Sequence, residues 1–362
     1  MKSQTLLTRA YNLLYSNSIR LLSVYGYRNW LKWRRLKGYY AGKRIFLIAN
    51  GPSLNITPLF LLKNEYTIMF NRITLMLERL NFIPNFYMIV DGLAGKTSQE
   101  DIRYFIGKNQ MVITPDITKA DHVRFMDFVP FKENVYYVYE EPTKFSHHLP
   151  FVNNGNTVIY AAFQVLKYLG FSEVYVVGND MNYVIHTTAE IMSEHAIKGR
   201  VTQNICSKQD DDPNHFDPRY FGKGKEYHQP TQEIMDSIFR GLDRVAKEYK
   251  KAGIKVINAG YNSMVKSFPK QEFYEALGYS QEKIDGLFDD LVKSKGLASK
   301  EWLLEKAVRK DDDWEEEIDA ASVPLEMATT IVKKKVLDYL PLGPYCGKLY
   351  FVNRKLIHRD ME

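Results

Sequence analysis

Between residues 44 and 259, short apolar runs of strand length alternate with longer segments of helical length. The apolar runs lie at 44–49, 66–70, 86–91, 110–115, 173–178 and 254–259, and they are rich in Val, Ile, Tyr and Phe. Helical patterns lie at 57–64, 72–80, 156–170 and 231–251. In the first of these, Thr57 can cap a helix with Pro58 at its first position, and Gly170 ends the third. This alternation predicts an α/β fold with an open, mostly parallel sheet and helices on both faces.

The expected strands end in small polar residues that are rich in amide side chains. These ends are Asn50-Gly51-Pro52-Ser53, Asn71-Arg72, Asp91-Gly92 and Asn179-Asp180-Met181-Asn182-Tyr183. Ligands of open α/β sheets bind at the carboxyl ends of the strands. Asn and Ser can hydrogen-bond a nucleobase edge, a ribose or a phosphate without adding charge. The simpler interpretation of any one such end is a turn whose side chain satisfies its own backbone.

The corner at 50–53 does not match the common nucleotide and hydrolase motifs. A dinucleotide fold needs Gly-x-Gly-x-x-Gly after the first strand, whereas this corner has one glycine followed by Pro52. The spaced glycines and Lys-Ser/Thr of a Walker A loop are missing from the corner, and the sequence has no Gly-x-Ser-x-Gly of a Ser-His-Asp hydrolase. We expect one wall of a nucleotide pocket here, without a phosphate cradle of its own.

Residues 203–230 show no helical or strand period and are crowded with Asp, Pro, Gly and His. A loop of this length inside a compact domain is usually a lid, a binding loop or a disordered linker. Its aromatic residues argue against a linker, so we expect an active-site lid. His215 and His228 are its candidate reactive side chains, and His186 is a further one. Its cations Arg219, Lys223 and Lys225 could neutralise a donor phosphate, although solvated charges explain them as simply.

A dedicated metal site is not expected. The run Asp210-Asp211-Asp212 matches the glycosyltransferase Asp-x-Asp pattern only nominally, because it lies in a loop and three consecutive carboxylates cannot all face one ion. The two cysteines, Cys206 and Cys346, are far apart and lack a Cys-x-x-Cys or Cys/His spacing. A reducing compartment therefore fits best, with the cytoplasm as the default.

The first 40 residues form a basic, aromatic arm. The first 64 residues carry 11 Lys or Arg and no acid, whereas acids outnumber bases in the remainder. Aromatic residues alternate with cations between 20 and 37, which suits an anionic membrane surface. A packed helix with a solvated basic face and a nucleic-acid contact are the alternatives. No segment has the composition of a transmembrane helix, and Arg9 interrupts the only apolar run that could serve as a secretory signal.

The pattern changes after about residue 268. Residues 269–362 are expected to form a highly charged helical appendage. The expected organisation is therefore an arm at 1–40, a catalytic domain at 41–268 with its lid at about 203–230, and a helical region at 269–362.

Five segments carry a resemblance to a known group of enzymes. They are "LIANGPSLN" (47–55), "MFNRI" (69–73), "NNGNTVIYAA" (153–162), "VYVVGNDMNY" (174–183) and "DPNHF" (212–216). In order, they resemble the motifs of bacterial sialyltransferases that use CMP-activated nonulosonic acids, and of the related DUF115 proteins. The latter include motility accessory factors and MptE-like pterin pyrophosphokinases. The resemblance spans about residues 44–265 and implies a single Rossmann-like sheet, a variant of the GT-A fold.

The resemblance also implies roles for particular residues. It places Asn50, Gly51, Ser53 and Asn71 at the CMP moiety of the donor, together with Asn156, Thr157, Gly178 and Asp180. Tyr183 corresponds to a tyrosine that stabilises the leaving phosphate, and His215 to the catalytic base. Two departures are visible: "NNGNT" replaces the "RITSG" element of the sialyltransferases, and Tyr183 is displaced by one position.

Residue chemistry agrees with these roles. A histidine can take the proton of an acceptor hydroxyl near neutral pH, and tyrosine hydroxyls with a helix N-terminus can stabilise a single departing phosphate without metal. We therefore expect an inverting, metal-independent glycosyltransferase acting on a surface glycan or lipid-linked acceptor at the cytoplasmic membrane face. The alternatives are a Mg²⁺-dependent pyrophosphokinase, with Asp91 and Asp180 as candidate ligands, and a non-catalytic assembly protein. Mg²⁺ is possible but not essential in the first case, no nucleic-acid partner is expected, and an oligomer is possible.

Overall fold

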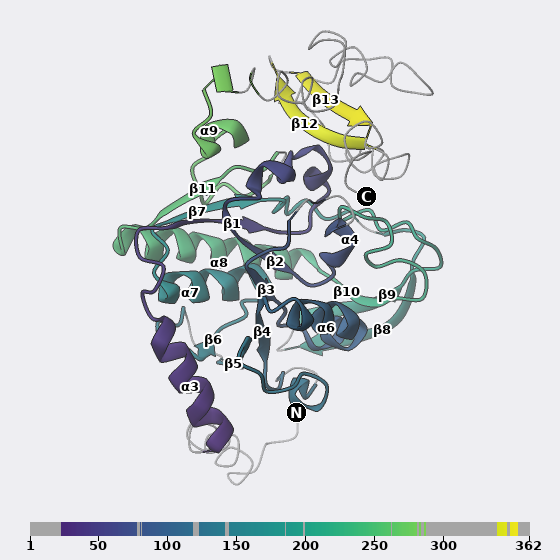
Figure 1. The fold of residues 1–362 in the computed structure, drawn as a ribbon. Coiled ribbons are helices and arrows are strands. Elements are labelled where there is room, and N and C mark those ends of the chain that lie inside the picture. The colour runs from purple at the N-terminus through teal and green to yellow at the C-terminus, as the bar shows by residue number, and fades with distance from the viewer. Residues whose placement is uncertain are drawn as a thin grey trace. The chain divides into compact units, whose positions relative to one another are not determined.

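The protein is described here from a computed structural model, shown as a ribbon in Figure 1. It describes residues 23–280 except 78–79, 81, 119–122, 142–144, 185, 198–199 and 262, together with 282–283, 286, 339–345 and 348–353. The chain divides into two compact units: unit 1 is Met1–Lys43 with Phe86–Ser172, and unit 2 is Arg44–Asn85 with Glu173–Glu362. Each unit therefore takes residues from inside and outside the expected continuous domain at 41–268.

Unit 2 contains four parallel strands in the order β11-β7-β1-β2. Their bounds are β1 Arg44–Ile48, β2 Tyr66–Phe70, β7 Glu173–Val177 and β11 Lys255–Asn258. The register pairs Ile48 of β1 with Val177 of β7, so these two strands end level with each other. All four apolar residues from Ile45 to Ile48 are fully buried, as expected for a strand covered on both faces.

Unit 1 contains four further parallel strands in the order β3-β4-β5-β6. Their bounds are β3 Phe86–Met88, β4 Met111–Pro115, β5 Val135–Glu140 and β6 Phe151–Val152. Strands β5 and β6 were not expected from the sequence. Each unit thus holds four parallel strands together with helices, which confirms the α/β, Rossmann-like fold class.

The two longest expected helices are present. Helix α7 (Val158–Leu169) begins at Thr157, whose side chain caps the Ile159 N–H, and ends at Gly170 in the left-handed conformation. Helix α8 (Gln232–Lys251) buries an apolar stripe that includes Leu242 and Val245. The shorter helices are α4 Thr74–Leu77, α5 Gly92–Thr97 and α6 Gln99–Gly107, with a 3₁₀ turn, η3, at Phe125–Asp127.

The expected α-helix at 57–64 is wrong. The structure instead has two short 3₁₀ segments, η1 (Pro52–Ile56) and η2 (Leu59–Leu62), and Pro58 precedes the second. Thr57 caps no helix; its hydroxyl donates to the carbonyl of Ser53 at 2.8 Å. The Thr57 hydroxyl is engaged by Ser53 and Pro58 has a non-helical backbone with ψ 67°, so neither residue starts an α-helix here.

The expected lid is only partly a loop. Its ends lie in strands β9 (Arg200–Cys206) and β10 (Glu226–Gln229), which pair antiparallel, and β9 also pairs with β8 (Glu190–Ile197). The register places Ile205 opposite Tyr227, and both are buried. Among the positions of the pair whose burial is described, these two carry the buried large apolar side chains, which is too short a pattern to recognise as a strand. The irregular part is the connecting loop, residues 207–225.

The expected helical region at 269–362 is only partly described. Helix α9 (Phe273–Leu277) is present, but β12 (Tyr339–Tyr345) and β13 (Lys348–Asn353) form an antiparallel hairpin. The helical expectation is wrong for these residues because Pro341, Gly343 and Pro344 disfavour an α-helix. Most of the region, including Cys346, lies outside the described residues. Within the described helices none is both long enough and apolar enough to cross a bilayer.

The described part of the basic arm forms helix α3 (Val24–Leu36), which packs against β5 within unit 1. Asn29 exchanges two hydrogen bonds with the backbone of Tyr137, and the indole of Trp33 donates to the Tyr137 carbonyl at 2.9 Å. Lys32 donates to the carbonyls of Lys132 and Val135. This buried face is what the packed-helix alternative predicts. Residues 1–22 of the arm lie outside the described residues.

Replacing Trp33 by alanine is expected to lower the free energy of unfolding by about 3–5 kcal/mol, because the side chain is fully buried and loses a hydrogen bond. Denaturant titration measures the change. Tyr27→Ala is the matched control, since Tyr27 lies on the same helix with 55% exposure, and it is expected to cost less than about 1 kcal/mol. Equal losses in both variants would contradict a buried anchoring face.

Candidate functional site

The carboxyl ends of β1 and β7 form a tight corner in unit 2. The Gly51 N–H donates to the Gly178 carbonyl at 2.7 Å, continuing the contact that Ala49 makes with Val177. A Cβ on Gly51 would lie 2.4 Å from Cγ of Asp180, closer than any real contact. Gly178 has φ +67° and is equally crowded by Leu54. Only glycine fits at both positions, so the two strand ends can approach closely.

A buried Asp180–Ser53 pair holds this corner. The Asp180 carboxylate accepts the Ser53 N–H at 2.8 Å and the Ser53 hydroxyl at 2.5 Å. Asp180 is 3% exposed and Ser53 is fully buried. Burial raises the pKa of Asp180 to about 6, although both bonds from Ser53 and the nearby His215 act in the opposite direction. Because their polar groups bond each other, Asp180 and Ser53 stabilise the shape of the corner.

Two amide side chains at this corner carry buried polar atoms that no described residue satisfies. They are Oδ1 of Asn50 and Nδ2 of Asn179. Both backbones are anchored: the Asn50 carbonyl accepts the Phe216 N–H at 3.0 Å, and the Asn179 carbonyl accepts the Ser263 hydroxyl at 2.7 Å. Buried polar atoms are nearly always paired in native proteins. One acceptor and one donor at the strand ends therefore suit a ligand with a polar edge, such as a nucleobase.

The end of β2 holds the connecting loop. The Arg72 guanidinium donates from Nη1 to the carbonyls of Arg219, at 2.7 Å, and of Tyr220. Asn71 adopts a left-handed backbone with φ 51°, and its side chain lies near the Tyr220 hydroxyl. The strand end that was expected to contact a nucleotide thus also fixes residues 219–220 of the loop.

His215 is a reactive group of the loop that is held by both a hydrogen bond and aromatic packing. Its Nδ1 lies 2.8 Å from Oδ2 of Asp212, and its ring stacks on Tyr220 with centroids 3.9 Å apart and planes 2° apart. The edge of Phe221 packs against the ring at 5.1 Å. The His215 side chain is 12% exposed and Asp212 is fully buried. In the described part of the chain, Nε2 makes no polar contact, so this nitrogen can act on a ligand.

Tyr183 lies near the Asp212–His215 pair. Its side chain is 41% exposed, and its hydroxyl is within electrostatic range of both Asp212 and Asp180. The next residue, Val184, exchanges two hydrogen bonds with the Asn214 side chain, of 2.7 and 2.9 Å. The segment after β7 is therefore tied to the loop that carries His215.

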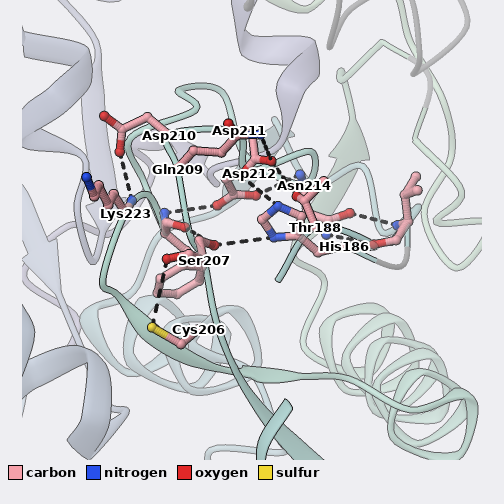
Figure 2. A network of polar contacts seen from close by, with 12 residues as sticks. His186, Thr188, Cys206, Ser207, Gln209, Asp210, Asp211, Asp212, Asn214 and Lys223 are labelled. Atoms are coloured by element: carbon pink, nitrogen blue, oxygen red, sulfur yellow. Dashed lines mark hydrogen bonds and ion pairs between the residues drawn. The ribbon is translucent and has the colours of Figure 1, made fainter. Parts of the chain in front are cut away.

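A second histidine, His186, is held by a polar network that includes Asp211, the residue before Asp212 (Figure 2). His186 is buried; its Nε2 contacts Oδ1 of Asp211 at 2.8 Å, and its Nδ1 contacts the Tyr227 hydroxyl. Asp211 also accepts from Thr188 and Gln209. Both ring nitrogens of His186 are thus occupied, which indicates a structural role for this candidate.

The remaining loop candidates lie at or near the surface. His228 is exposed on β10, and Lys223 is exposed in the connecting loop, its backbone N–H bonded to Asp210. Lys225 is half-buried at the end of the loop. The Arg219 guanidinium forms a bidentate ion pair with Asp217, at 2.8 and 2.9 Å. Cys206 is a free thiol, as expected.

Three of the residues singled out from the sequence belong to unit 1. Asn156 has a left-handed backbone with φ 66°, and Thr157 caps α7. Asp91 caps α5 by accepting the Ala94 N–H at 2.7 Å. Each is described within unit 1 alone. Among the described residues no group of three His, Cys, Asp or Glu side chains is placed to hold a metal ion.

Asp212 and Tyr220 belong to the site but were not predicted to do so. Asp212 was considered only as part of a nominal metal motif. The sequence signal for Asp212 is the Asp-Pro-Asn-His spacing. When the chain turns between the first and fourth of these residues, the carboxylate of Asp212 contacts the imidazole of His215. Tyr220 carries no comparable local signal.

Residues 25–186 match the family model described as "6-hydroxymethylpterin diphosphokinase MptE-like". The match covers less than half of the chain and confirms the resemblance to the MptE-like superfamily. No curated relative matches the chain.

Two solved structures are similar to the chain, each at 14% identity. For the MAf glycosyltransferase from Magnetospirillum magneticum AMB-1 the TM-score is 0.40, over 92% of this chain and 57% of that one. For the sialyltransferase CstII from Campylobacter jejuni, in complex with the substrate analogue CMP-3FNeuAc, it is 0.35, over 63% and 85%. The chain thus spans little more than half the length of the first. At these scores the likenesses do not establish a shared activity.

The buried Asp180 predicts a pH-dependent stability difference. A carboxyl whose pKa is raised from 3.8 to about 6 on folding binds more protons in the folded state, so its contribution to stability falls as the pH rises through this window. Asp180→Asn preserves the shape, with an oxygen for the Ser53 N–H and an amide for its hydroxyl. Between pH 4 and 7 the variant is expected to gain up to about 3 kcal/mol relative to the parent protein. If the difference in the free energy of unfolding between the variant and the parent protein were the same at pH 4 and pH 7, this prediction would be contradicted.

Proposed function

We propose that this protein is an inverting glycosyltransferase that moves a nonulosonic acid, or a related keto-sugar acid, from a CMP donor to a hydroxyl of a surface-glycan acceptor. The observation that carries the proposal is the Asp212–His215 pair: its Nε2 makes no polar contact with a described residue, and the next residue, Phe216, is bonded to Asn50 at the end of β1. An imidazole held in this way is suited to take a proton from an acceptor hydroxyl.

Donor binding is assigned to the corner of unit 2. Oδ1 of Asn50 and Nδ2 of Asn179 supply an acceptor and a donor for the polar edge of the nucleotide, and Gly51 lets the backbone come close to it. In the proposed reaction His215 takes the acceptor proton, the acceptor oxygen attacks the anomeric carbon, and the bond from that carbon to the CMP phosphate breaks. Tyr183 is assigned to the leaving phosphate. No metal is required in this scheme.

A diphosphokinase on the same fold is the second candidate, favoured by the description of the matching family model. It would transfer a diphosphate to a hydroxyl, so it could use the same base, but it would need Mg²⁺. The carboxylates considered for that ion already hold protein groups: Asp180 binds Ser53 through both oxygens, and Asp91 caps α5. This geometry favours the metal-independent reaction.

The donor class and the base can be tested together. CMP-sugars are expected to release CMP in the presence of EDTA, whereas Mg²⁺-dependent AMP release from ATP with a pterin acceptor would favour the diphosphokinase. His215→Ala is expected to reduce turnover by about 10²–10⁴-fold and to leave CMP affinity nearly unchanged. Asn50→Ala is the reciprocal control, because it should weaken CMP binding measured by calorimetry. Unchanged turnover in His215→Ala would remove His215 from the mechanism.

We further propose that the protein acts at an anionic membrane surface, where a lipid-linked acceptor would lie. The solvent face of α3 carries Arg28, Arg34 and Arg35, with Tyr27 exposed among them, and the helix has no acidic residue. Aromatic and cationic side chains on one exposed helix face suit lipid headgroups. The opposite face stays packed in unit 1, so binding would not require the helix to detach.

Charge reversal of this face tests the membrane proposal. The triple variant Arg28→Glu, Arg34→Glu, Arg35→Glu is expected to lose sedimentation with vesicles containing anionic lipid, and the parent protein to lose it as salt rises. The matched control reverses three exposed cations of α8: Arg244, Lys247 and Lys250. Equal loss in both variants would indicate a general charge effect, and no loss in either would overturn the proposal.

A further inference from the structure

We propose that Asp212 is the positioning residue for His215: it fixes the imidazole in the tautomer with a proton on Nδ1 and a lone pair on Nε2. This inference rests on the proposed function for its catalytic meaning. The arrangement itself is independent of the substrate and can be tested without it.

The carboxylate of Asp212 faces only donors. Its Oδ1 accepts the Asn214 N–H at 2.8 Å, and its Oδ2 accepts the Phe221 N–H at 3.0 Å and the His215 Nδ1 at 2.8 Å. An ionised carboxylate can only accept hydrogen bonds, so Nδ1 must carry a proton. In the neutral imidazole the lone pair is then on Nε2, the nitrogen without a polar contact among the described residues.

The orientation of the ring is fixed by packing as well. The Tyr220 ring lies parallel to His215 at 3.9 Å, and the Phe221 edge closes a second side at 5.1 Å. Tyr220 is held in turn through its carbonyl by Arg72. A half-turn of the imidazole would keep its plane but lose the bond to Asp212, and any smaller rotation would disturb the stack, so Nε2 keeps one direction.

The consequence for the reaction is electrostatic. When Nε2 takes the acceptor proton, the neutral imidazole becomes an imidazolium, and the adjacent negative charge of Asp212 stabilises it. The proton moves from the acceptor oxygen to Nε2, and Asp212 stays ionised throughout. The carboxylate thus lowers the energy of the protonated base without exchanging a proton itself.

The preceding residue provides a matched control. Asp211 binds a different histidine, the buried His186, at the same distance of 2.8 Å but through Nε2 (Figure 2). That network includes Tyr227. Asp211→Asn therefore removes one carboxylate from the same loop without touching His215. A purely structural role for Asp212 would give the two asparagine variants similar effects.

The first experiment compares Asp212→Asn with Asp211→Asn in the transfer reaction. An asparagine at 212 keeps the shape and can keep its oxygen toward His215 and Phe221, but it loses the charge. Turnover is expected to fall by about 10–1,000-fold, and the acid limb of the pH–turnover profile to move to lower pH, because the imidazolium is no longer favoured. In a His215→Ala background the same change should cost less than about twofold, since the two residues act as a unit. Asp211→Asn should leave the acid limb in place.

The second experiment needs no substrate. The proton on Nδ1 of His215 is expected to give a slowly exchanging, downfield resonance in the NMR spectrum, lost in Asp212→Ala and His215→Ala and retained in Asp211→Asn. If this pattern holds while no CMP-sugar is turned over, the proposed function fails and the positioning role stands. A resonance unchanged in Asp212→Ala, or an acid limb that moves equally in both asparagine variants, would overturn the inference.

Discussion

The site depends on the contact between the ends of β1 and β7, which the buried Ser53–Asp180 pair secures. A charged or polar side chain is expensive to bury unless it is hydrogen-bonded, and here each partner supplies what the other needs. Gly51 and Gly178 make the contact possible by leaving no Cβ between the chains. Asn50 directly precedes Gly51 and Asn179 directly follows Gly178, so the corner that buries one polar pair also holds two amide groups with unsatisfied polar atoms.

The connecting loop is built onto this corner and adds the reactive group. It is attached at the ends of three elements: by Phe216 to the end of β1, by residues 219 and 220 to the end of β2, and by Asn214 to the segment after β7. Those attachments are hydrogen bonds of backbone, amide and guanidinium groups, which set position more strictly than apolar contacts do. The sheet therefore fixes the position of His215 through these bonds, although His215 lies in an irregular segment.

Much of the fold could be predicted from the sequence because its strands are local apolar runs. The run at 66–70 coincides with β2, and Thr157 and Gly170 mark the ends of α7 as their chemistry suggests. Failures occurred where tertiary contacts override local patterns. Residues 57–64 form 3₁₀ turns instead of an α-helix, and β9 with β10 becomes apparent only once they pair. The same holds for the site. Asn50 and His215 could be proposed from their chemistry and their place in the sequence, whereas the Ser53–Asp180 bond joins positions 127 residues apart and needs the fold to bring them together.

The adjacent carboxylates Asp211 and Asp212 bind two different histidines. This division depends on the exact spacing of the chain, because one residue inserted or deleted before them would move each carboxylate away from its own histidine. Gly222 adds to this, because a Cβ there would collide with Asp210. At Gly224, by contrast, the surroundings are open. Changes in loop length during evolution should therefore collect around residue 224, while the spacing from Asp210 to Gly222 stays constant.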